Sequence, residues 1–351
     1  MTTSRRYLII SLCVLLAVVV IWLSLRSTAP VVPEAIRRGY SEALTQAREG
    51  RPGAARMLYQ QLGRPDISVK RRIWLHAELP NYPSPLALKL ADRDLQNPSP
   101  EVRIAAINSI SGLVPAAQRS LLLGPLLEDA DQRVRFAAVN ALLGLSPDDL
   151  NLYFGPVQQA IDAWQQMLEQ APESAANHYQ LARLHLHNGE FKAAQQALEQ
   201  TLRLAPDNLP ALVMQIEVLD KQGQSEAARL LLARQLKAQP DSAYLQHALG
   251  LWLLHHGQSE FALLGLSKAV ELEPDNKQYR YDLATTLHDE QELEAAQKQL
   301  QEIVQRHPAD RKARVLLINY WKESGQLQNV QILLAQLEQL NPDDPALQQG
   351  L

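Results

Sequence analysis

Histidines are the residues here whose chemistry most needs testing, because imidazole binds metals and transfers protons near neutral pH. His185 and His187 lie two residues apart, and His255–His256 is an adjacent pair. On a helix such neighbours point in different directions, so neither pair can hold one metal ion together. His247 and His288 could meet across neighbouring segments, but no carboxylate or thiol is spaced to complete a zinc site. We therefore expect no metal and no other cofactor.

Catalytic motifs are missing from the sequence. It contains no glycine-rich phosphate loop, no GxSxG, no HExxH and no carboxylate pair implied by spacing. The single cysteine, Cys13, rules out an internal disulfide, a thiolate zinc cage and a CxxCH haem attachment. The net charge of −4 provides no basic footprint for nucleic acid. The sequence thus predicts a protein that is not an enzyme and binds no nucleic acid.

The amino terminus carries a long uncharged run. Residues 7–25 contain no charge and are bracketed by Arg5, Arg6 and Arg26. As a helix they would reach about 30 Å, the thickness of a hydrocarbon core. We predict a transmembrane anchor at 7–25, a cytoplasmic tail at 1–6 and a proline-rich linker at 26–33; a cleaved signal peptide is the alternative. The arginines on the short tail favour a single-pass protein of a bacterial-type inner membrane, with its body on the periplasmic side.

The strongest pattern is a 34-residue period. Proline recurs at Pro172, Pro206, Pro240, Pro274, Pro308 and Pro342. In the same frame come a glycine column (Gly155, Gly189, Gly223, Gly257 and Gly325, with Gln291 as the exception) and an alanine column (Ala160, Ala194, Ala228, Ala262 and Ala296, then Val330). We expect the glycine to end a first helix, the alanine to lie where two helices cross, and the proline to end the second helix.

This arrangement resembles the tetratricopeptide repeat (TPR). The resemblance covers five full repeats at 175–342, a half repeat at 151–172 and a short C-terminal cap, so the array spans 151–351. A 32-residue period lies upstream: SPEVRIAAINSISGL aligns with DQRVRFAAVNALLGL and resembles HEAT repeats, in which an acidic turn residue precedes an arginine by six positions. Asp129 and Arg135 fit that pattern, whereas Asn97 and Arg103 keep only the spacing. We assign 34–150 to HEAT-like helical repeats.

The predicted fold is all-α: a transmembrane helix followed by one continuous right-handed α-solenoid, HEAT-like and then TPR. Phrases such as EALTQAREGRPGA and LEQLNPDDPAL also resemble the carboxyl-terminal half of exported multihaem cytochromes. That resemblance implies a location outside the cytoplasm. The resemblance does not imply electron transfer, because the chain has no CxxCH motif for haem attachment.

The first helix of each repeat is expected to line a concave groove. Tyrosine and histidine suit peptide binding there, because they bury area at low entropic cost and keep a polar end. The predicted groove residues are Tyr179, Arg183, His187, Glu217, Lys221, Tyr244, His247, His255, Tyr281, Thr285, His288, Asn319 and Lys322. Some TPR proteins hold the terminal carboxylate of a peptide with a clamp of lysine and asparagine side chains in the groove. This clamp is absent here, because the fifth residues of the first helices are Tyr179, Val213, His247, Tyr281 and Val315.

These features predict a membrane-anchored scaffold that binds a peptide or partner protein through the TPR groove. The alternatives are an assembly factor or chaperone for exported proteins such as cytochromes or secretion components, and a non-haem subunit of a membrane oxidoreductase. The cap after the last repeat is short, so we expect Leu334, Leu337 and Leu340 to be partly exposed and to support weak self-association.

Overall fold

A computed structural model describes residues 34–348, and every regular element within them is helical. The chain divides into two units, Met1–Glu42 and Ala43–Leu351. The predicted tail, anchor and linker at 1–33, with Cys13, lie outside the described residues. Within the described part, no helix has the length and apolar character needed to cross a membrane.

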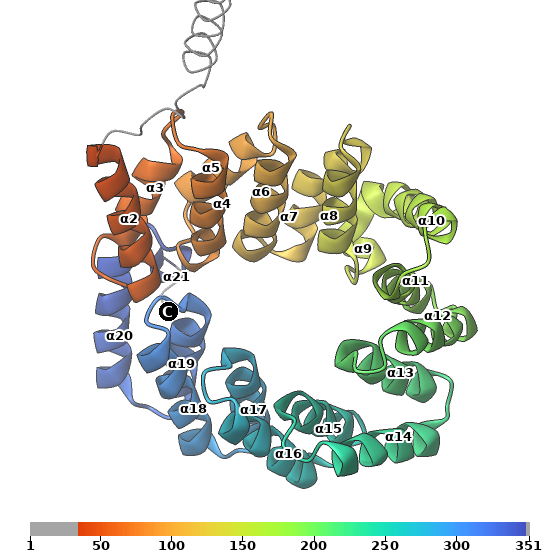
Figure 1. Cartoon of the computed structure of the whole chain (residues 1–351). Helices are drawn as coiled ribbons and strands as arrows, with labels where there is room; N and C mark the ends of the chain where they lie inside the picture. Colours follow the sequence, from red (N-terminus) through yellow and green to blue (C-terminus); the bar gives the residue numbers. More distant parts are fainter. Residues whose placement is uncertain (1–33, 349–351) are drawn as a thin grey trace, which may run out of the picture. The chain divides into compact units, whose positions relative to one another are not determined.

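The second unit consists of helices that follow one another along the chain (Figure 1). The first group comprises the end of α2 (Glu34–Glu49), α3 (Ala54–Leu62), α4 (Val69–Glu78), η1 (Leu79–Asn81), α5 (Pro85–Asp94), α6 (Pro100–Leu113), α7 (Ala116–Leu123), η2 (Gly124–Glu128), α8 (Gln132–Leu142), α9 (Pro147–Leu150) and η3 (Asn151–Tyr153). The second group comprises α10 (Phe154–Gln170), α11 (Ala175–His187), α12 (Phe191–Leu204), α13 (Leu209–Lys221), α14 (Ser225–Ala238), α15 (Ala243–His255), α16 (Ser259–Leu272), α17 (Lys277–Asp289), α18 (Leu293–Arg306), α19 (Arg311–Glu323), α20 (Leu327–Leu340) and α21 (Pro345–Gln348).

The 34-residue period reappears as repeated helix boundaries. Each first helix begins after a capping side chain that accepts a hydrogen bond from a backbone N–H within the first turn. These caps are Ser174, Asn208, Ser242, Asn276 and Asp310, each 34 residues after the last. The caps form a fourth column of the pattern, beside the glycine, alanine and proline columns that were predicted.

The glycine column ends the first helices at positive φ, as expected. Gly189, Gly223, Gly257 and Gly325 have φ between 70° and 75°, and Gln291 adopts φ 65° at the exceptional position. Gly155 departs from the prediction: it lies in the first turn of α10 without a positive φ. The half repeat has no first helix for this glycine to end, which accounts for the difference.

The two arginines of the 32-residue period have different partners. Arg103 extends from α6 to Asp129 just before α8, with Nη2 and Oδ1 2.8 Å apart, and its Nη1 donates to the Asn97 carbonyl at 2.7 Å. Arg135 donates instead to the carbonyl oxygen of Asp129. The acidic side chain therefore pairs with the arginine of the preceding unit, and this ion pair joins α6 to α8.

The carboxyl-terminal end of the second unit contacts the first helices of the same unit. The side-chain amide of Asn341 donates to the Pro83 carbonyl at 2.7 Å, and the Gly53 backbone N–H donates to the Gln339 carbonyl at 2.8 Å. A Cβ atom on Gly50 would lie 2.5 Å from the Pro308 carbonyl oxygen, so the two backbones are in close contact. We call this set of contacts the clasp.

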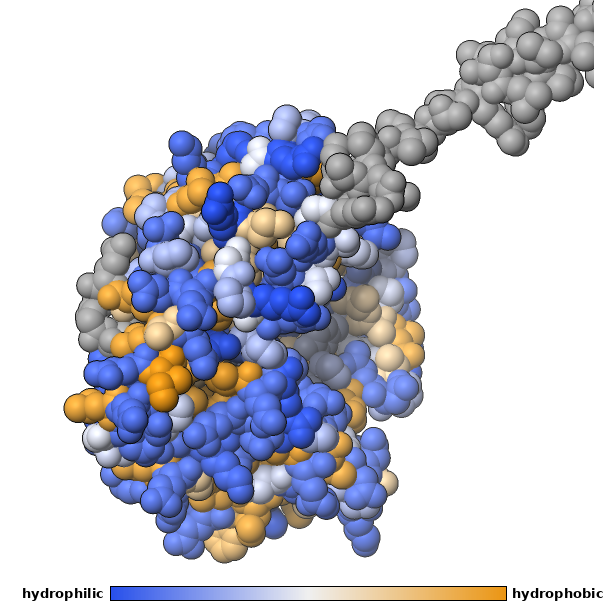
Figure 2. Space-filling model, turned by 90° about the vertical axis from the view of Figure 1, so that its left-hand side faces the viewer, coloured by the Kyte–Doolittle hydropathy of each residue, from blue (hydrophilic) through white to orange (hydrophobic). Residues whose placement is uncertain are grey.

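The clasp changes the expectation for the last repeat. Leu337 is 1% exposed, Leu340 is 5% exposed and Leu334 is half-buried. The predicted exposure of Leu337 and Leu340 is therefore wrong, because elements from the beginning of the second unit cover that end. On the side where α20 lies, hydrophobic side chains form small groups among hydrophilic ones (Figure 2).

Candidate functional site

The first helices of the repeats, α11, α13, α15, α17 and α19, carry all the predicted groove residues. Their accessibility differs from residue to residue. Exposed side chains are His187, Glu217, Lys221, His255 and Thr285; half-buried side chains are Tyr179, Arg183, Tyr244, His247, His288, Asn319 and Lys322. Tyr281 is buried. Exposure alone therefore leaves most of the predicted set available to a ligand.

A pocket of about 240 Å³ brings three of the predicted residues together between α13 and α15. Its apolar part is formed by Val213, Ile216, Leu251 and Trp252, and its polar part by Glu217, Asp220, Lys221 and His255. Leu251 is 43% exposed, so its side chain is available to a ligand. An apolar floor with a charged rim is suited to one hydrophobic side chain of a bound peptide. We call it the α13–α15 pocket.

One wall of this pocket is fixed by an aromatic and an ionic contact. The Trp252 ring lies 4.1 Å from the His256 ring, centroid to centroid. His256 Nε2 in turn lies 3.0 Å from Asp220 Oδ2. Burial alone would raise the pKa of Asp220, but hydrogen bonds with His256 and Ser225, together with the other contacts of this carboxylate, outweigh burial and hold the pKa below its ordinary value. The indole is therefore positioned before any ligand arrives.

Histidine–carboxylate pairs also join the later first helices. His247 Nε2 lies 2.7 Å from Asp282 Oδ2, and His288 Nε2 lies 2.5 Å from Glu323 Oε2. His247 also contacts the Tyr279 ring, and His288 stacks on Tyr320 at 4.0 Å.

These contacts show that both histidines hold adjacent repeats together, which limits their freedom to contact a ligand. In each pair the residues are 35 positions apart. A histidine and a carboxylate separated by one period plus one residue therefore indicate a contact between adjacent repeats. This spacing was not among the predicted features. No group of three or more possible metal ligands occurs within residues 34–348.

Tyr281 occupies different surroundings from those expected. Tyr281 is only 4% exposed, and its hydroxyl donates to Asp310 at the start of α19. Burial, followed by that negatively charged neighbour, raises the pKa of Tyr281. The Thr285 hydroxyl donates back to the Tyr281 carbonyl at 3.1 Å. The assignment of Tyr281 as an accessible groove contact is therefore wrong; the residue is part of the interface between repeats.

The two tyrosines nearer the beginning of the array remain accessible. Tyr179 and Tyr244 are half-buried, and burial raises the pKa of both hydroxyls; in Tyr244 the proximity of Tyr179 adds to the effect. Arg183 is held by its Nη1 donating to Gln180 Oε1 at 2.9 Å. These side chains present neutral hydroxyls and one cation to the groove.

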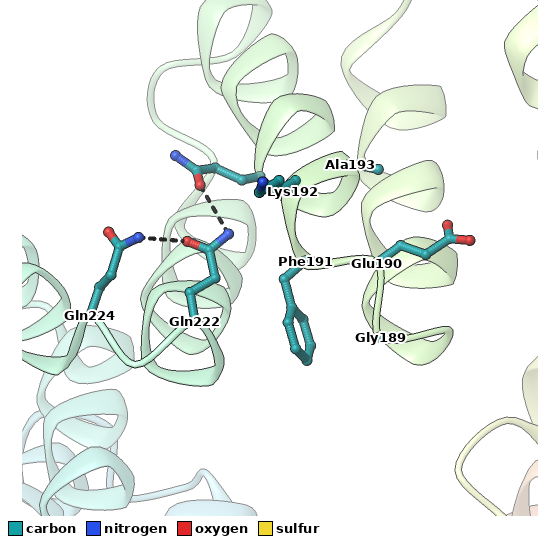
Figure 3. A pocket seen from close by; sticks show the side chains of 8 residues that line it. Gly189, Glu190, Phe191, Lys192, Ala193, Gln222 and Gln224 are labelled. Carbon is teal, nitrogen blue, oxygen red and sulfur yellow. Dashed lines mark hydrogen bonds between the residues drawn. The ribbon is translucent and has the colours of Figure 1, made fainter.

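A larger but more open hollow of about 710 Å³ lies where the turn after α11 meets the turn after α13 (Figure 3). Gln222 donates to Gln195 at 3.1 Å, and Gln224 donates to Gln222 at the same distance. Glu190 points away from these amides (Figure 3). The side chains here hydrogen-bond one another and present no convergent set of charges, so size alone does not make this hollow the better candidate.

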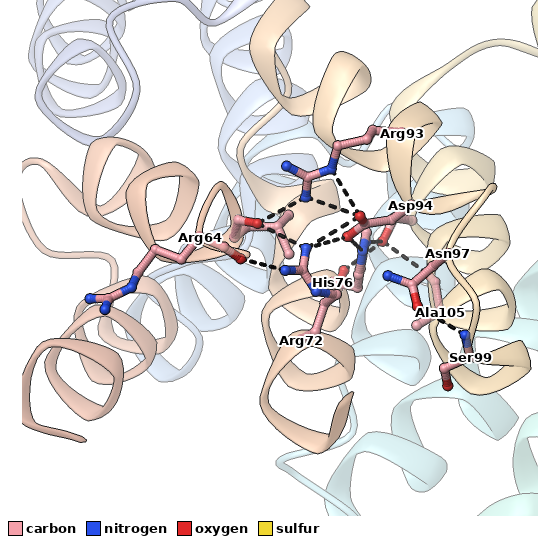
Figure 4. A network of polar contacts seen from close by, with 10 residues as sticks. Arg64, Arg72, His76, Arg93, Asp94, Asn97, Ser99 and Ala105 are labelled. Atoms are coloured by element: carbon pink, nitrogen blue, oxygen red, sulfur yellow. Dashed lines mark hydrogen bonds and ion pairs between the residues drawn. The ribbon is translucent and has the colours of Figure 1, made fainter. Parts of the chain in front are cut away.

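A buried polar network lies among the first helices (Figure 4). His76 contacts Asp94 Oδ2 through Nε2 and Ser109 Oγ through Nδ1, both at 2.9 Å. The order Asp–His–Ser resembles a hydrolytic triad, but all three side chains are buried and the Ser109 hydroxyl is within bonding distance of the His76 carbonyl. Arg72 pairs with Asp94 at 2.8 Å. A substrate has no access to this serine, and the network connects α4, α5 and α6.

Comparison with known proteins identifies the repeated part of the chain. Residues 154–211 and 187–251 match a family model described as Tetratricopeptide repeat, and residues 263–350 match a second model with the same description. Together the matches cover more than half of the chain. The HEAT and cytochrome resemblances are not confirmed, and no catalytic family is indicated. No curated protein matches the chain.

Solved structures offer a weaker likeness. A thermophilic TPR protein of Thermus thermophilus is 21% identical, with a TM-score of 0.40 over 58% of this chain and 98% of that one. YrrB, described as a TPR protein with an unusual peptide-binding site, is 20% identical, with a TM-score of 0.36 over 54% of this chain and 98% of that one. Neither similarity carries a conclusion about the function of this chain.

Proposed function

This chain belongs to the tetratricopeptide repeat family, and we propose that it is an interaction scaffold that binds an extended peptide or a partner protein along the first helices of its repeats. The observation that carries the proposal is the α13–α15 pocket, where an exposed apolar floor is bordered by Glu217, Lys221 and His255. A hydrophobic side chain of the partner would enter this pocket. Burying it against Leu251 and Trp252 contributes about 1.5–3 kcal/mol.

The positioning of the groove supports binding without rearrangement. Ion pairs such as His256–Asp220 and His247–Asp282 join consecutive first helices, so the side chains that face a ligand are held in place. Binding to a preorganised surface loses less conformational entropy, because its side chains are already ordered. No step of this function requires a reaction or a cofactor.

Membrane attachment is a separate part of the proposal. It is supported by the uncharged run at 7–25 and its flanking arginines. On that basis we propose a single-pass anchor in an inner membrane of bacterial type, with the repeats on the periplasmic side. Resistance of the full chain to alkaline carbonate extraction from isolated membranes would agree with an anchor; release into the supernatant would contradict it.

The binding proposal is tested with two leucine variants of similar exposure. Leu251→Asp places a charge in the α13–α15 pocket, whereas Leu230→Asp changes a side chain of α14 that is 50% exposed and lies outside the pocket. The full chain and both variants are incubated with an array of twelve-residue peptides. We expect peptides with a central large hydrophobic residue to bind the parent chain and Leu230→Asp, and to lose at least tenfold in affinity for Leu251→Asp.

Equal binding by the two variants would contradict the pocket as the anchor point. Alanine at Tyr179 and Tyr244 extends the test along the groove. Tyr281 is unsuitable for this purpose, because its removal would disturb the contact between α17 and α19. Stable capture of a folded partner in a fixed ratio would agree with a scaffold. Transient capture of unfolded exported proteins would favour the assembly-factor alternative.

A further inference from the structure

Another cavity, of about 520 Å³, lies between early and late helices of the second unit. Pro80, Asn81 and Gly112 contribute one side of it, from η1 and α6. The opposite side is contributed by α17 and α19, from residues more than 160 positions later in the chain. We call it the seam cavity. The cavity depends on the clasp, because its walls come from both early and late helices of the second unit.

Positive charge is concentrated on the later side of the seam cavity. Lys277, Arg311 and Lys312 line it, whereas Asp310 is the one carboxylate among its lining residues. The three cations occupy the first turns of α17 and α19, where the helix dipole disfavours positive charge by about 0.3–1 kcal/mol each. Local helix stability therefore does not account for their position.

The three cations differ in how far they are neutralised. Lys277 Nζ lies 2.8 Å from Asp310 Oδ2, and Arg311 binds both oxygens of buried Asp344 at 2.6 and 2.7 Å. Lys312 lies over the Tyr281 ring, 4.4 Å from its centroid. The charge of Lys312 also acts on the Asp282 carboxylate, but that carboxylate accepts hydrogen bonds from Gln278 and lies 2.7 Å from His247 Nε2. The ammonium group of Lys312 is exposed and remains available to an anion.

Neutral hydrogen-bonding groups surround these charges. Asn81, Gln278 and Asn319 add side-chain amides, and Val315 and Leu316 supply an apolar wall. Cations and amide donors beside an apolar surface match a carboxylate carried on a peptide, because the peptide also offers apolar atoms to bury. A bare inorganic anion would leave the apolar wall unused.

We infer that the seam cavity binds an acidic peptide segment, with side-chain carboxylates placed at Lys312 and an apolar residue against Val315 and Leu316. This inference goes beyond the proposed function, because it names a partner chemistry for a different place from the α13–α15 pocket. The clasp contributes by holding Asn81 opposite α19. The chain thus recognises an acidic partner only while its two ends are joined.

The test uses two amide-terminated, fluorescein-labelled peptides, EELEEL and QQLQQL, titrated with the full chain in detergent and followed by fluorescence anisotropy. We expect EELEEL to bind at least tenfold more tightly at low salt and the preference to shrink as salt is raised. Lys312→Glu should remove the preference. Lys298→Glu, an exposed charge reversal on α18 outside the cavity, should leave it intact.

Two further variants separate this inference from the proposed function. Asn341→Ala removes the hydrogen bond to the Pro83 carbonyl and should weaken EELEEL binding at least fivefold. Leu251→Asp should leave the preference for EELEEL over QQLQQL unchanged, because that residue lies in the other pocket and both peptides carry the same leucines. Equal affinity of the parent chain for the two peptides, an effect of Lys298→Glu equal to that of Lys312→Glu, or loss of the preference in Leu251→Asp would overturn the inference. Displacement of EELEEL by millimolar inorganic phosphate would overturn it in favour of a small-anion site.

Discussion

Asp310 holds the start of α19, and replacing it tests how adjacent repeats are joined. It is 4% exposed; its Oδ1 accepts the Ala313 N–H at 2.9 Å and the Tyr281 hydroxyl, and its Oδ2 accepts Lys277 Nζ. Asp310→Ala removes a helix cap, at about 1 kcal/mol. It also leaves the buried Tyr281 hydroxyl without a partner, at about 1–3 kcal/mol. The pair with half-exposed Lys277 adds at most about 1 kcal/mol.

We therefore expect Asp310→Ala to lower the free energy of unfolding by about 2–5 kcal/mol, measured by urea denaturation with circular dichroism. Asn276→Ala is the matched control. Asn276 caps α17 one period earlier, but its cap bond is exposed and serves no buried hydroxyl. It should cost about 1 kcal/mol or less. Equal losses in the two variants would refute the reasoning, because they would show that the Tyr281 contact contributes nothing.

The same residue predicts a pH dependence. Burial alone would raise the pKa of Asp310, but hydrogen bonds from Lys277 and Tyr281 outweigh it and hold the pKa below its ordinary value. Its contribution to stability is therefore complete above about pH 4 and is lost as the pH falls through the lowered folded-state pKa. Asp310→Asn should lessen this loss while keeping an acceptor for the cap, in urea titrations between pH 3 and pH 6.

Three other substitutions test separate features of the fold. Gln291→Gly relieves a positive φ of 65° and should raise the free energy of unfolding by about 0.5–1 kcal/mol in urea denaturation. Asp94→Ala leaves the buried Arg72 guanidinium without its main carboxylate partner and should cost about 3–5 kcal/mol by the same measurement. Gly265→Val places side-chain atoms where a Cβ would already lie 3.1 Å from the Gly250 nitrogen; it should cost about 1–3 kcal/mol and speed amide exchange in α15.

The repeated helices could be predicted because their causes are local. A glycine at positive φ, a small residue at the helix crossing and a proline after the second helix each act within one hairpin. The period therefore specified the helical hairpins of the TPR array, and the capping column from Ser174 to Asp310 could have been read from the same frame. Gly155 occupies its place in the 34-residue period but does not adopt the predicted positive φ, because the half repeat has no first helix for it to end.

The candidate site was predicted less well, since it depends on contacts between units. The frame identified Glu217 and His255, which lie in the α13–α15 pocket, but not Leu251 or Trp252, which form its floor. The prediction for Tyr281 was wrong because a residue's position in a helix indicates which face of the helix it lies on, but not which residues pack against that face. The hydroxyl of Tyr281 is bound by Asp310, which belongs to the next repeat.

The clasp could not be predicted from the spacing of residues in the sequence. Asn341 and Pro83 are 258 residues apart, and no periodic signal relates them. Whether a stack of hairpins returns to its start depends on small rotations accumulated over every unit. A local pattern does not determine that sum.

Closure also answers a problem that every repeat array has, which is the exposure of apolar faces at its two ends. Here the ends cover each other, so Leu337 and Leu340 are buried although the segment after α20 is short. The self-association expected of an exposed last repeat should therefore be weak in the parent chain and should appear when the clasp is weakened. Asn341→Ala leaves the Pro83 carbonyl unpaired and favours separation of the ends. Sedimentation velocity over a hundredfold range of concentration should detect dimers of this variant and few of the parent; equal association of the two would show that these leucines are not the cause.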